Sequence, residues 1–523
     1  MTTTDFELFK SFVKKTTFLT TALPYANGPL HVGHLYEAIL ADIYAKATGA
    51  VLISGDDQHG AAITLYTLKN KIDILDHIEC QYREHTQQYQ QLNVDFDYFG
   101  QTHSELHQKL VQHYYNQLKN NGYIFSKSTF SWFDEKAKQF LPDRYVRGAC
   151  PGCRAPDIFP NVCEQCGLSF EAKDLLNPVS VISNCTPVLK ETEHSFLNTT
   201  DFYAKLEKLL GQGLICESAK NKVQEPGLHL VTDFDITRDN PYFGIPVPEA
   251  KEQSFYVWFD APIAYISFVL EYLQSLYREQ FSNNLEFSQL LELIPLIKFK
   301  HVIGKDIVYF HTYFWLNLLN LLEDRPGVEK IQVHGWIVDD AGNKYSKSAG
   351  NSIDLTQFSA QQLDAIRLYF FCVYEEGIQD HNFSHAKAYE LYNQFIVGKF
   401  VNIYSRISTI VETKLDCAIQ EDVVDIQDQS FKIDAYLEKF EFKAAFFAVN
   451  DWLAVVNQYI QDNKPWKVEN RADLNRICFN ALYQFRLITK YIRIICPNLG
   501  QKLDKIDYSN IKKQRLSERI KTS

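Results

Sequence analysis

A short apolar run near the start of the chain, followed by a turn and a helix, constrains the fold more than any other feature. Residues 18–23 read Phe-Leu-Thr-Thr-Ala-Leu and stop at Pro24, and the turn-forming sequence Asn-Gly-Pro follows at 27–29. Apolar residues recur at helical spacing over 35–43, and a second strand-like run covers 51–55. Strand, helix and strand in this order predict a parallel sheet with a right-handed crossover.

Strand-like runs return much later in the chain, at 299–303 and 331–335. The region between about 126 and 230 loses the strand–helix alternation and contains a cluster of cysteines. We therefore expect the parallel sheet to be split by an inserted domain.

The C-terminal part is expected to be helical. There is no glycine between Gly398 and Gly500, and Pro465 and Pro497 are the only prolines there. Apolar residues at 449, 453, 456 and 460 keep helical spacing, which predicts one buried stripe of a packed helix.

The length and charge limit the function. A chain of 523 residues is long enough for about three domains. The net charge of −11 argues against sequence-independent binding of nucleic acid, which depends on a basic surface. The chain has no apolar run long enough to cross a membrane and no secretory leader, so we expect it in the cytoplasm and not at a membrane.

Four of the eleven cysteines form two Cys-x-x-Cys pairs, Cys150 with Cys153 and Cys163 with Cys166. Two such pairs in one short segment predict a tetrahedral zinc site, and a reducing compartment disfavours the alternative of disulfides. Four thiolates leave no open coordination position, so the zinc is expected to be structural.

Two histidines flank a glycine where the first helix should begin: His31, Gly33 and His34. The free N–H groups and the dipole of a helix N-terminus attract anions, and imidazoles add donors, so the segment suits a phosphate. The alternative is that both histidines merely cap the helix.

A second candidate phosphate site is the loop Lys-Tyr-Ser-Lys-Ser at 344–348. The ammonium groups of Lys344 and Lys347 could close on the pyrophosphate that leaves during attack at an α-phosphate. The alternative is a solvated surface loop.

Together, in this order, the two segments resemble the HIGH and KMSKS signatures of class I aminoacyl-tRNA synthetases. The segments 22–25, 255–262 and 304–311 are similar to the methionine pocket of the methionyl-tRNA synthetase family, and the resemblance covers nearly the whole chain. It implies an α/β fold in which a split, Rossmann-like, parallel-sheet catalytic domain contains an inserted zinc-knuckle domain and precedes an α-helical bundle that binds the anticodon. The expected divisions are 1–125 and 231–340 for the catalytic domain, 126–230 for the insertion, 341–390 for the KMSKS-like loop and stem-contact region, 391–505 for the helical domain and 506–523 for a basic tail.

The resemblance also implies roles for individual residues. Asp57 is expected to hold the α-ammonium of the substrate. The side-chain pocket is expected to consist of Ala22, Leu23, Tyr25, Trp258, Ala261, Pro262, Tyr265, Ile307, Phe310 and His311. Gly304 and Asp306 resemble the pair that contacts the ribose of ATP, and Arg238 resembles a phosphate-binding arginine; Gly33 and Lys347 complete the ATP site. His31, His34, Lys344 and Lys347 are the expected catalytic residues, with Mg²⁺ accompanying ATP. Ordinary aromatic core is the alternative for the pocket residues.

A further match lies in the helical region. Asn402 and Arg406 are four residues apart, hence on one helix face, and Pro465 and Trp466 lie at a helix break. They match the residues with which the family reads the CAU anticodon of methionine tRNA, an indole stacking on a base and polar groups reading base edges.

The chain also departs from the family pattern. Tyr345 replaces the methionine of KMSKS, so we expect the packing of the loop to change more than its chemistry. Met1 is the only methionine, and one hypothesis is that this frees synthesis of the chain from its own product beyond initiation. We expect a monomer, because no C-terminal dimerisation domain follows the helical region. The basic residues after Lys502 indicate either a local basic path or the solvated face of a terminal helix.

The resemblance therefore implies an enzyme that activates L-methionine with ATP and transfers it to methionine tRNA. A synthetase for leucine, isoleucine or valine is the second interpretation, although such enzymes need an editing domain because one methylene gives only about 1–3 kcal/mol of discrimination. A regulator that binds RNA or methionine without aminoacylation is the third.

Overall fold

The computed structural model describes residues 3–521 except 164, 167, 171, 224–232, 344 and 346–354. Five parallel strands form the central sheet in the order β16-β15-β1-β2-β3. Their bounds are β1 Thr17–Thr21, β2 Val51–Asp56, β3 Tyr98–Gln101, β15 Lys298–Gly304 and β16 Gly327–His334. The chain order reverses between β1 and β15, and ligands of open parallel sheets bind at the carboxyl ends of strands at such a reversal. The predicted split parallel sheet is confirmed.

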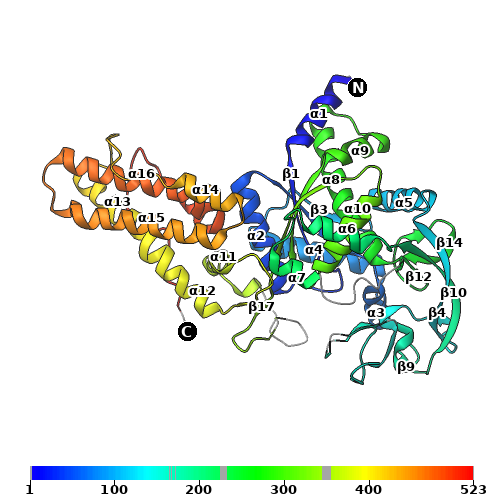
Figure 1. Cartoon of the computed structure of the whole chain (residues 1–523). Coiled ribbons are helices and arrows are strands. Elements are labelled where there is room, and N and C mark those ends of the chain that lie inside the picture. The colour runs from blue at the N-terminus through cyan, green and yellow to red at the C-terminus, as the bar shows by residue number, and fades with distance from the viewer. Residues whose placement is uncertain are drawn as a thin grey trace.

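Helices pack around the central sheet (Figure 1). They are α1 Thr3–Lys15, α2 Val32–Thr48, α3 Ala61–Asn70, α4 Ile74–Gln91, α5 Glu105–Asn120, α8 Val257–Phe281, α9 Phe287–Leu293, the 3₁₀ turn η4 Ile294–Leu296, the π-helical segment η5 Phe310–Trp315, and α10 Leu316–Leu321. The α2 helix begins after β1 and ends at Gly49, whose φ of 75° is the left-handed conformation that suits glycine at a helix end.

The insertion lies on one side of the sheet domain (Figure 1). Its core is a long antiparallel pair of strands, β4 Ile124–Asp134 and β10 Val188–Asn198, flanked by β5 Gln139–Phe140 and β11 Asp233–Asp235. The smaller elements within the predicted insertion are η1 Asp143–Tyr145, β6 Val146–Ala149, β7 Asn161–Val162, β8 Ser169–Phe170, η2 Ala172–Asp174, β9 Leu176–Ser180, α6 Phe202–Leu210 and α7 Glu217–Val223. After it follow β12 Thr237–Asp239, β13 Pro246–Val247 and β14 Ala250–Phe255, which form a three-stranded sheet.

The last third of the chain forms an arm of helices on the other side (Figure 1). Its elements are β17 Ile337–Val338, η6 Leu355–Gln357, α11 Ala360–Val373, β18 His381–Asn382, α12 His385–Tyr392, the π-helical η7 Asn393–Val401, α13 Asn402–Lys414, α14 Ser430–Glu438, α15 Phe442–Asn463, η8 Pro465–Lys467, α16 Arg471–Ile495 and α17 Pro497–Leu503. The stripe predicted on α15, Val449, Leu453, Val456 and Ile460, is buried, which confirms the packed helix.

A buried arginine fastens the arm to the sheet domain. The guanidinium of Arg367 on α11 donates to the Asp42 carboxylate of α2 at 2.6 Å and to the carbonyls of Ile494 and Ile495 at 2.9 and 3.1 Å. Arg367 and Asp42 are 0% and 1% exposed, so the ion pair is shielded from water while further hydrogen bonds satisfy the arginine.

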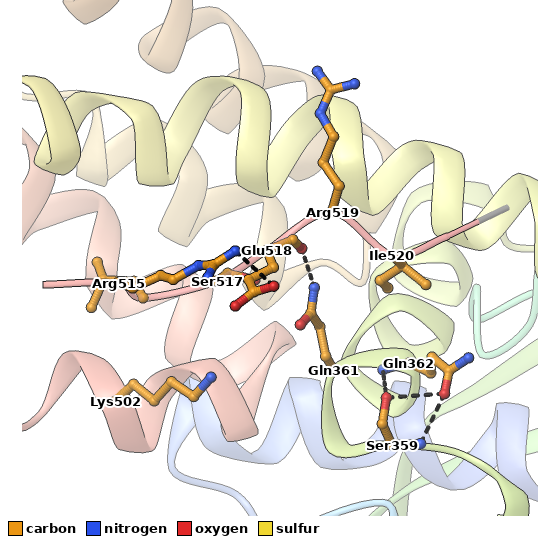
Figure 2. A pocket seen from close by; sticks show the side chains of 10 residues that line it. Ser359, Gln361, Gln362, Lys502, Arg515, Ser517, Glu518, Arg519 and Ile520 are labelled. Carbon is orange, nitrogen blue, oxygen red and sulfur yellow. Dashed lines mark hydrogen bonds and ion pairs between the residues drawn. The ribbon is translucent and has the colours of Figure 1, made fainter.

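The tail after α17 runs back along the arm without forming a helix. The Tyr404 hydroxyl donates to the Lys512 carbonyl at 3.0 Å, and the Ile520 N–H donates to Asn393 at 2.8 Å. Figure 2 shows the tail crossing the start of α11, where the Gln361 amide donates to the Glu518 carbonyl beside a cavity of about 390 Å³. The interpretation of a terminal helix face is therefore wrong for the basic residues that follow Lys502, whereas Lys502 itself lies on α17. Among the described residues, no helix has the length and hydropathy needed to cross a membrane.

Candidate active site

The carboxyl ends of β1 and β15 open into a cavity of about 80 Å³. Its lining residues are Ala22, Leu23, Asp57, Trp258, Ala261, Pro262, Tyr265, Ile307, Phe310, His311 and Trp315. The structure thus brings together every predicted residue of the amino-acid site except Tyr25, which lies beside it and forms a β-bridge with Asp57. The lining comes from segments after β1, β2 and β15 and from the first turns of α8, so only the folded sheet creates the cavity.

The walls of the cavity are aromatic. The rings of Trp258 and Phe310 stack with centroids 3.5 Å apart and planes 7° from parallel. The hydroxyl of Tyr265 and Nε2 of His311 are 2.8 Å apart. His311 Nδ1 lies 3.1 Å from the Ile307 carbonyl and must donate to it, which leaves Nε2 as acceptor for the Tyr265 hydroxyl. Burial lowers the pKa of His311 to about 4, so this polar pair is uncharged at neutral pH.

Trp315 completes the cavity wall and was not predicted. Its indole N–H donates to Nε2 of His301 at 3.3 Å, and His301 Nδ1 lies 2.6 Å from the Thr20 hydroxyl. This buried chain ties η5 to the central strands β15 and β1. The available signals were a histidine inside an apolar strand run and a tryptophan four residues beyond His311.

Among the described residues that line the cavity, only Asp57 carries an acidic group. Burial and the neighbouring Asp260 raise the pKa of Asp57 well above its usual range. A half-buried carboxyl group at one end of a neutral aromatic cavity suits a ligand with a cationic head, because an opposite charge compensates the desolvated carboxylate.

The two histidines at the start of α2 cap the helix. His31 Nδ1 accepts from the Gly33 N–H at 3.1 Å, His34 Nδ1 accepts from the His31 N–H at 3.4 Å, and the two rings stack at 3.7 Å. A Cβ on Gly33 would lie 3.0 Å from the His31 ring, so the glycine leaves room for this stack. The capping alternative is thus present in the structure, while a contact with phosphate stays a prediction.

The predicted ribose residues follow β15 directly. A Cβ on Gly304 would lie 2.7 Å from Oδ1 of Asp306, so only glycine allows this carboxylate to turn back over the strand end. Glu37, which was not predicted, joins the same region: it accepts from the Ala22 N–H at 2.5 Å and lies 2.9 Å from Nε2 of His334. It fixes the ends of β1 and β16 against α2.

Arg238 lies on β12, close to the start of α8. Its guanidinium is 3.6 Å from the centre of the Tyr256 ring and donates to the Thr237 carbonyl at 2.7 Å. Tyr256 is the residue before α8, whose second residue is Trp258. The arginine therefore lies beside the segment that lines the cavity.

Lys344 and Lys347 lie outside the described residues. Tyr345, between them, is described: its hydroxyl donates to the Phe383 carbonyl at 3.1 Å, and its ring lies against Phe383. A methionine at this position could not donate that hydrogen bond.

The four predicted zinc ligands meet in the insertion. The sulfur atoms of Cys150, Cys153, Cys163 and Cys166 all lie within 4.8 Å of one another, and Cys150–Cys166 and Cys153–Cys163 are 3.8 and 3.6 Å apart. Tetrahedral zinc with Zn–S bonds of about 2.3 Å requires sulfur atoms roughly 3.8 Å apart. The donor set therefore fits such a metal ion.

The predicted anticodon residues also lie together, at the far part of the arm. The Arg406 guanidinium of α13 is 5.1 Å from the Trp466 ring, and Lys414 donates to the Trp466 carbonyl at 3.0 Å. Pro465 is buried, whereas Trp466 is 39% exposed. Asn402 lies one turn before Arg406 on α13.

The comparisons agree with this geometry. The family model described as "tRNA synthetases class I (M)" matches residues 17–408. Two structures of Mycobacterium tuberculosis methionyl-tRNA synthetase, each with methionyl-adenylate, resemble the chain with a TM-score of 0.70 over 94% of both chains, at 20% and 19% identity. At this identity the likeness shows a shared fold. The chain belongs to the class I tRNA synthetases of the methionine group and is an aminoacyl-tRNA ligase.

Proposed function

We propose that the protein joins L-methionine to ATP, giving methionyl-adenylate and pyrophosphate, and then transfers the methionyl group to methionine tRNA with release of AMP. The observation that carries this proposal is the uncharged aromatic cavity with Asp57 at one end, located where the parallel sheet reverses its order. Family membership supports the reaction class, and the methionyl-adenylate bound by the M. tuberculosis proteins supports the substrates.

The cavity suits methionine in particular. Asp57 would pair with the α-ammonium, and the stacked rings of Trp258 and Phe310 would contact the polarizable thioether. The hydroxyl of Tyr265, bonded to neutral His311, adds a polar group that a sulfur atom can approach. Leucine, isoleucine and valine carry no such atom, so they would not make these contacts.

In the first step an oxygen of the methionine carboxylate attacks the α-phosphate of ATP, and the bond to the departing pyrophosphate breaks. Gly33, Gly304, Asp306 and Arg238 would bind the nucleotide; His31, His34, Lys344 and Lys347 would stabilise the developing charge on the phosphates; Mg²⁺ would accompany ATP. In the second step a terminal ribose hydroxyl of the tRNA attacks the acyl carbon and AMP leaves.

A single Zn²⁺ held by Cys150, Cys153, Cys163 and Cys166 is part of the proposal. When bound, the ion would cross-link two short loops. Its role would be structural, because four thiolates leave no coordination position for substrate. Two backbone bonds shape these loops: Cys150 N–H donates to the Ala155 carbonyl at 3.0 Å, and Cys163 N–H donates to the Leu168 carbonyl at 2.9 Å.

Recognition of the CAU anticodon is assigned to Asn402, Arg406, Pro465 and Trp466. Trp466 would stack on an unpaired base, while Arg406 and Asn402 would bond base edges. The division of the chain into catalytic domain, insertion, stem-contact region, helical domain and tail, as predicted from the sequence, belongs to the same proposal; a monomer remains a prediction.

Amino-acid-dependent exchange of pyrophosphate into ATP tests the first step. We expect exchange with methionine and at least about tenfold lower kcat/KM with leucine, isoleucine or valine, because none of them carries the thioether that the stacked rings and the Tyr265 hydroxyl would contact. Asp57→Asn should raise the KM for methionine more than the KM for ATP. Exchange that prefers one of the three aliphatic amino acids would refute the assignment of methionine.

A further inference from the structure

Three carboxyl groups lie close together in the part of the cavity where the substrate ammonium is proposed to bind. Asp56 ends β2, Asp57 follows it, and Asp260 lies in the first turn of α8. Two of them face an imidazole: Asp56 Oδ1 is 2.8 Å from His85 Nδ1, and Asp260 Oδ2 is 2.5 Å from His59 Nδ1. The Asp57 carboxylate instead accepts the backbone N–H of His59 at 3.4 Å and lines the cavity.

His59 thus touches both of the carboxyl groups closest to the substrate. Its ring is completely buried, and its Nε2 lies 3.1 Å from Nδ1 of His103. Burial and the proximity of His59 lower the pKa of His103 to about 4, so His103 is neutral and its Nδ1 can accept a hydrogen bond. His59 can then donate from both ring nitrogens, to Asp260 on one side and to His103 on the other.

We propose that His59 is a positioning residue of the amino-acid site: its ring neutralises Asp260 and its backbone N–H orients Asp57, so that Asp57 alone presents a negative charge to the substrate ammonium. The inference rests on the proposed activation of an amino acid. Without the imidazole, the buried charge of Asp260 would act directly on Asp57, and two neighbouring buried carboxylates do not ionise together easily.

The surroundings leave this task to His59. Among the described residues, the other titratable or charged groups that act on these carboxyl groups and on His59 are His85, which faces Asp56, and His103, His107, Tyr25 with Arg144, Tyr265, Tyr82 and Tyr89. Burial, together with the charge of Asp57, raises the pKa values of Tyr25 and Tyr265 far above neutrality, so neither carries a charge. Burial lowers the pKa of His107 well below its usual value, and its Nδ1 lies 2.9 Å from the Ser267 hydroxyl, so it faces no carboxylate.

The test uses His59→Gln, Asp260→Asn, the double variant and the control His107→Gln. Methionine-dependent pyrophosphate exchange would be measured from pH 6 to 9, with separate KM values for methionine and ATP and a melting temperature for each variant. His59→Gln should raise the KM for methionine at least about tenfold at pH 7, the effect of one unit in the pKa of Asp57. The increase should grow as the pH falls, while the KM for ATP stays within about twofold.

The double variant carries the decisive comparison. Asp260→Asn in the His59→Gln background removes the orphaned charge, so it should return the KM for methionine to within about threefold of the wild-type value. Asp260→Asn alone should move the rise of this KM to lower pH, because Asp57 then ionises more easily. This second readout keeps the test valid if His59→Gln does not fold.

Three results would overturn the inference: a double variant as impaired as His59→Gln, equal losses for methionine and ATP, or the same methionine defect in His107→Gln. Failure of the proposed function looks different, since the wild-type protein would then show no exchange with methionine.

Discussion

Replacing Trp466 by alanine should separate the two steps of the reaction. The ring is 39% exposed at the far part of the helical arm, with the Arg406 guanidinium 5.1 Å from its centre. A stack of an aromatic side chain on a base contributes about 1–3 kcal/mol. At about 1.4 kcal/mol per tenfold, the kcat/KM for tRNA should fall roughly 5-fold to 100-fold. Exchange of pyrophosphate without tRNA should stay unchanged, because the cavity at β1 and β15 is built from other segments.

The matched control is Phe447→Ala, which removes another exposed ring of the same arm, 50% exposed on α15. Charging of a purified tRNA with a CAU anticodon, at tRNA concentrations below KM, gives kcat/KM for both variants. The reasoning is refuted if Trp466→Ala charges as well as Phe447→Ala, or if exchange falls together with charging.

Three further predictions follow from other parts of the molecule. Cys163→Ser should abolish the binding of one zinc per chain, measured by elemental analysis, and should lower the melting temperature; full zinc content in the variant would contradict the four-cysteine site. Lys347→Ala should slow pyrophosphate exchange by about 10²–10³ while methionine binding, followed by calorimetry, stays near normal; equal losses would contradict the assigned role. Burial opposes protonation of His194, but hydrogen bonds to Asp235 and Asp239 raise its pKa to about 9. Because the folded-state pKa is raised, this stabilisation is complete below the ordinary histidine pKa and is lost as the pH rises through about 9, so the melting-temperature difference between wild type and His194→Gln should shrink over that range.

The architecture could be predicted because local patterns determine it. The strand run at 18–23 and the glycine-free region after Gly398 predict a parallel sheet and a helical arm, and both are present. The turn after β1 and the burial of the α15 stripe follow from the same rules of spacing. The path of the tail could not be predicted in this way. Its side chains Ile511 and Leu516 are buried, and the tail bonds to Tyr392 of α12 and Tyr404 of α13, partners that no local pattern encodes.

The candidate site was found by resemblance rather than by periodicity. Trp258 and Phe310 are ordinary aromatic residues until β15 and α8 bring them together. Residues that hold the site in place were missed, among them Glu37, His59 and Trp315. Each is a buried side chain whose partner lies far away in the sequence, as with Glu37 and His334, so its purpose appears only once the chain is folded.

The spacing of cysteines was the most informative short pattern. Two Cys-x-x-Cys pairs predict a ligand cluster directly, and the four sulfur atoms lie within 4.8 Å of one another. The histidines at the start of α2 were less informative, because the same two residues are compatible with a helix cap, which the structure shows, and with a phosphate site, which stays a prediction.

Charging of tRNA tests the central claim most directly. Purified protein, ATP, radiolabelled methionine and a methionine tRNA transcript should yield methionyl-tRNA. A second transcript, identical except that another anticodon replaces CAU, should be charged at least about tenfold more slowly, because Asn402, Arg406 and Trp466 would lose their base contacts. Equal charging of both transcripts would contradict the reading of the anticodon. If protein that binds zinc and melts cooperatively transfers methionine to neither transcript, that result would contradict the proposed function itself.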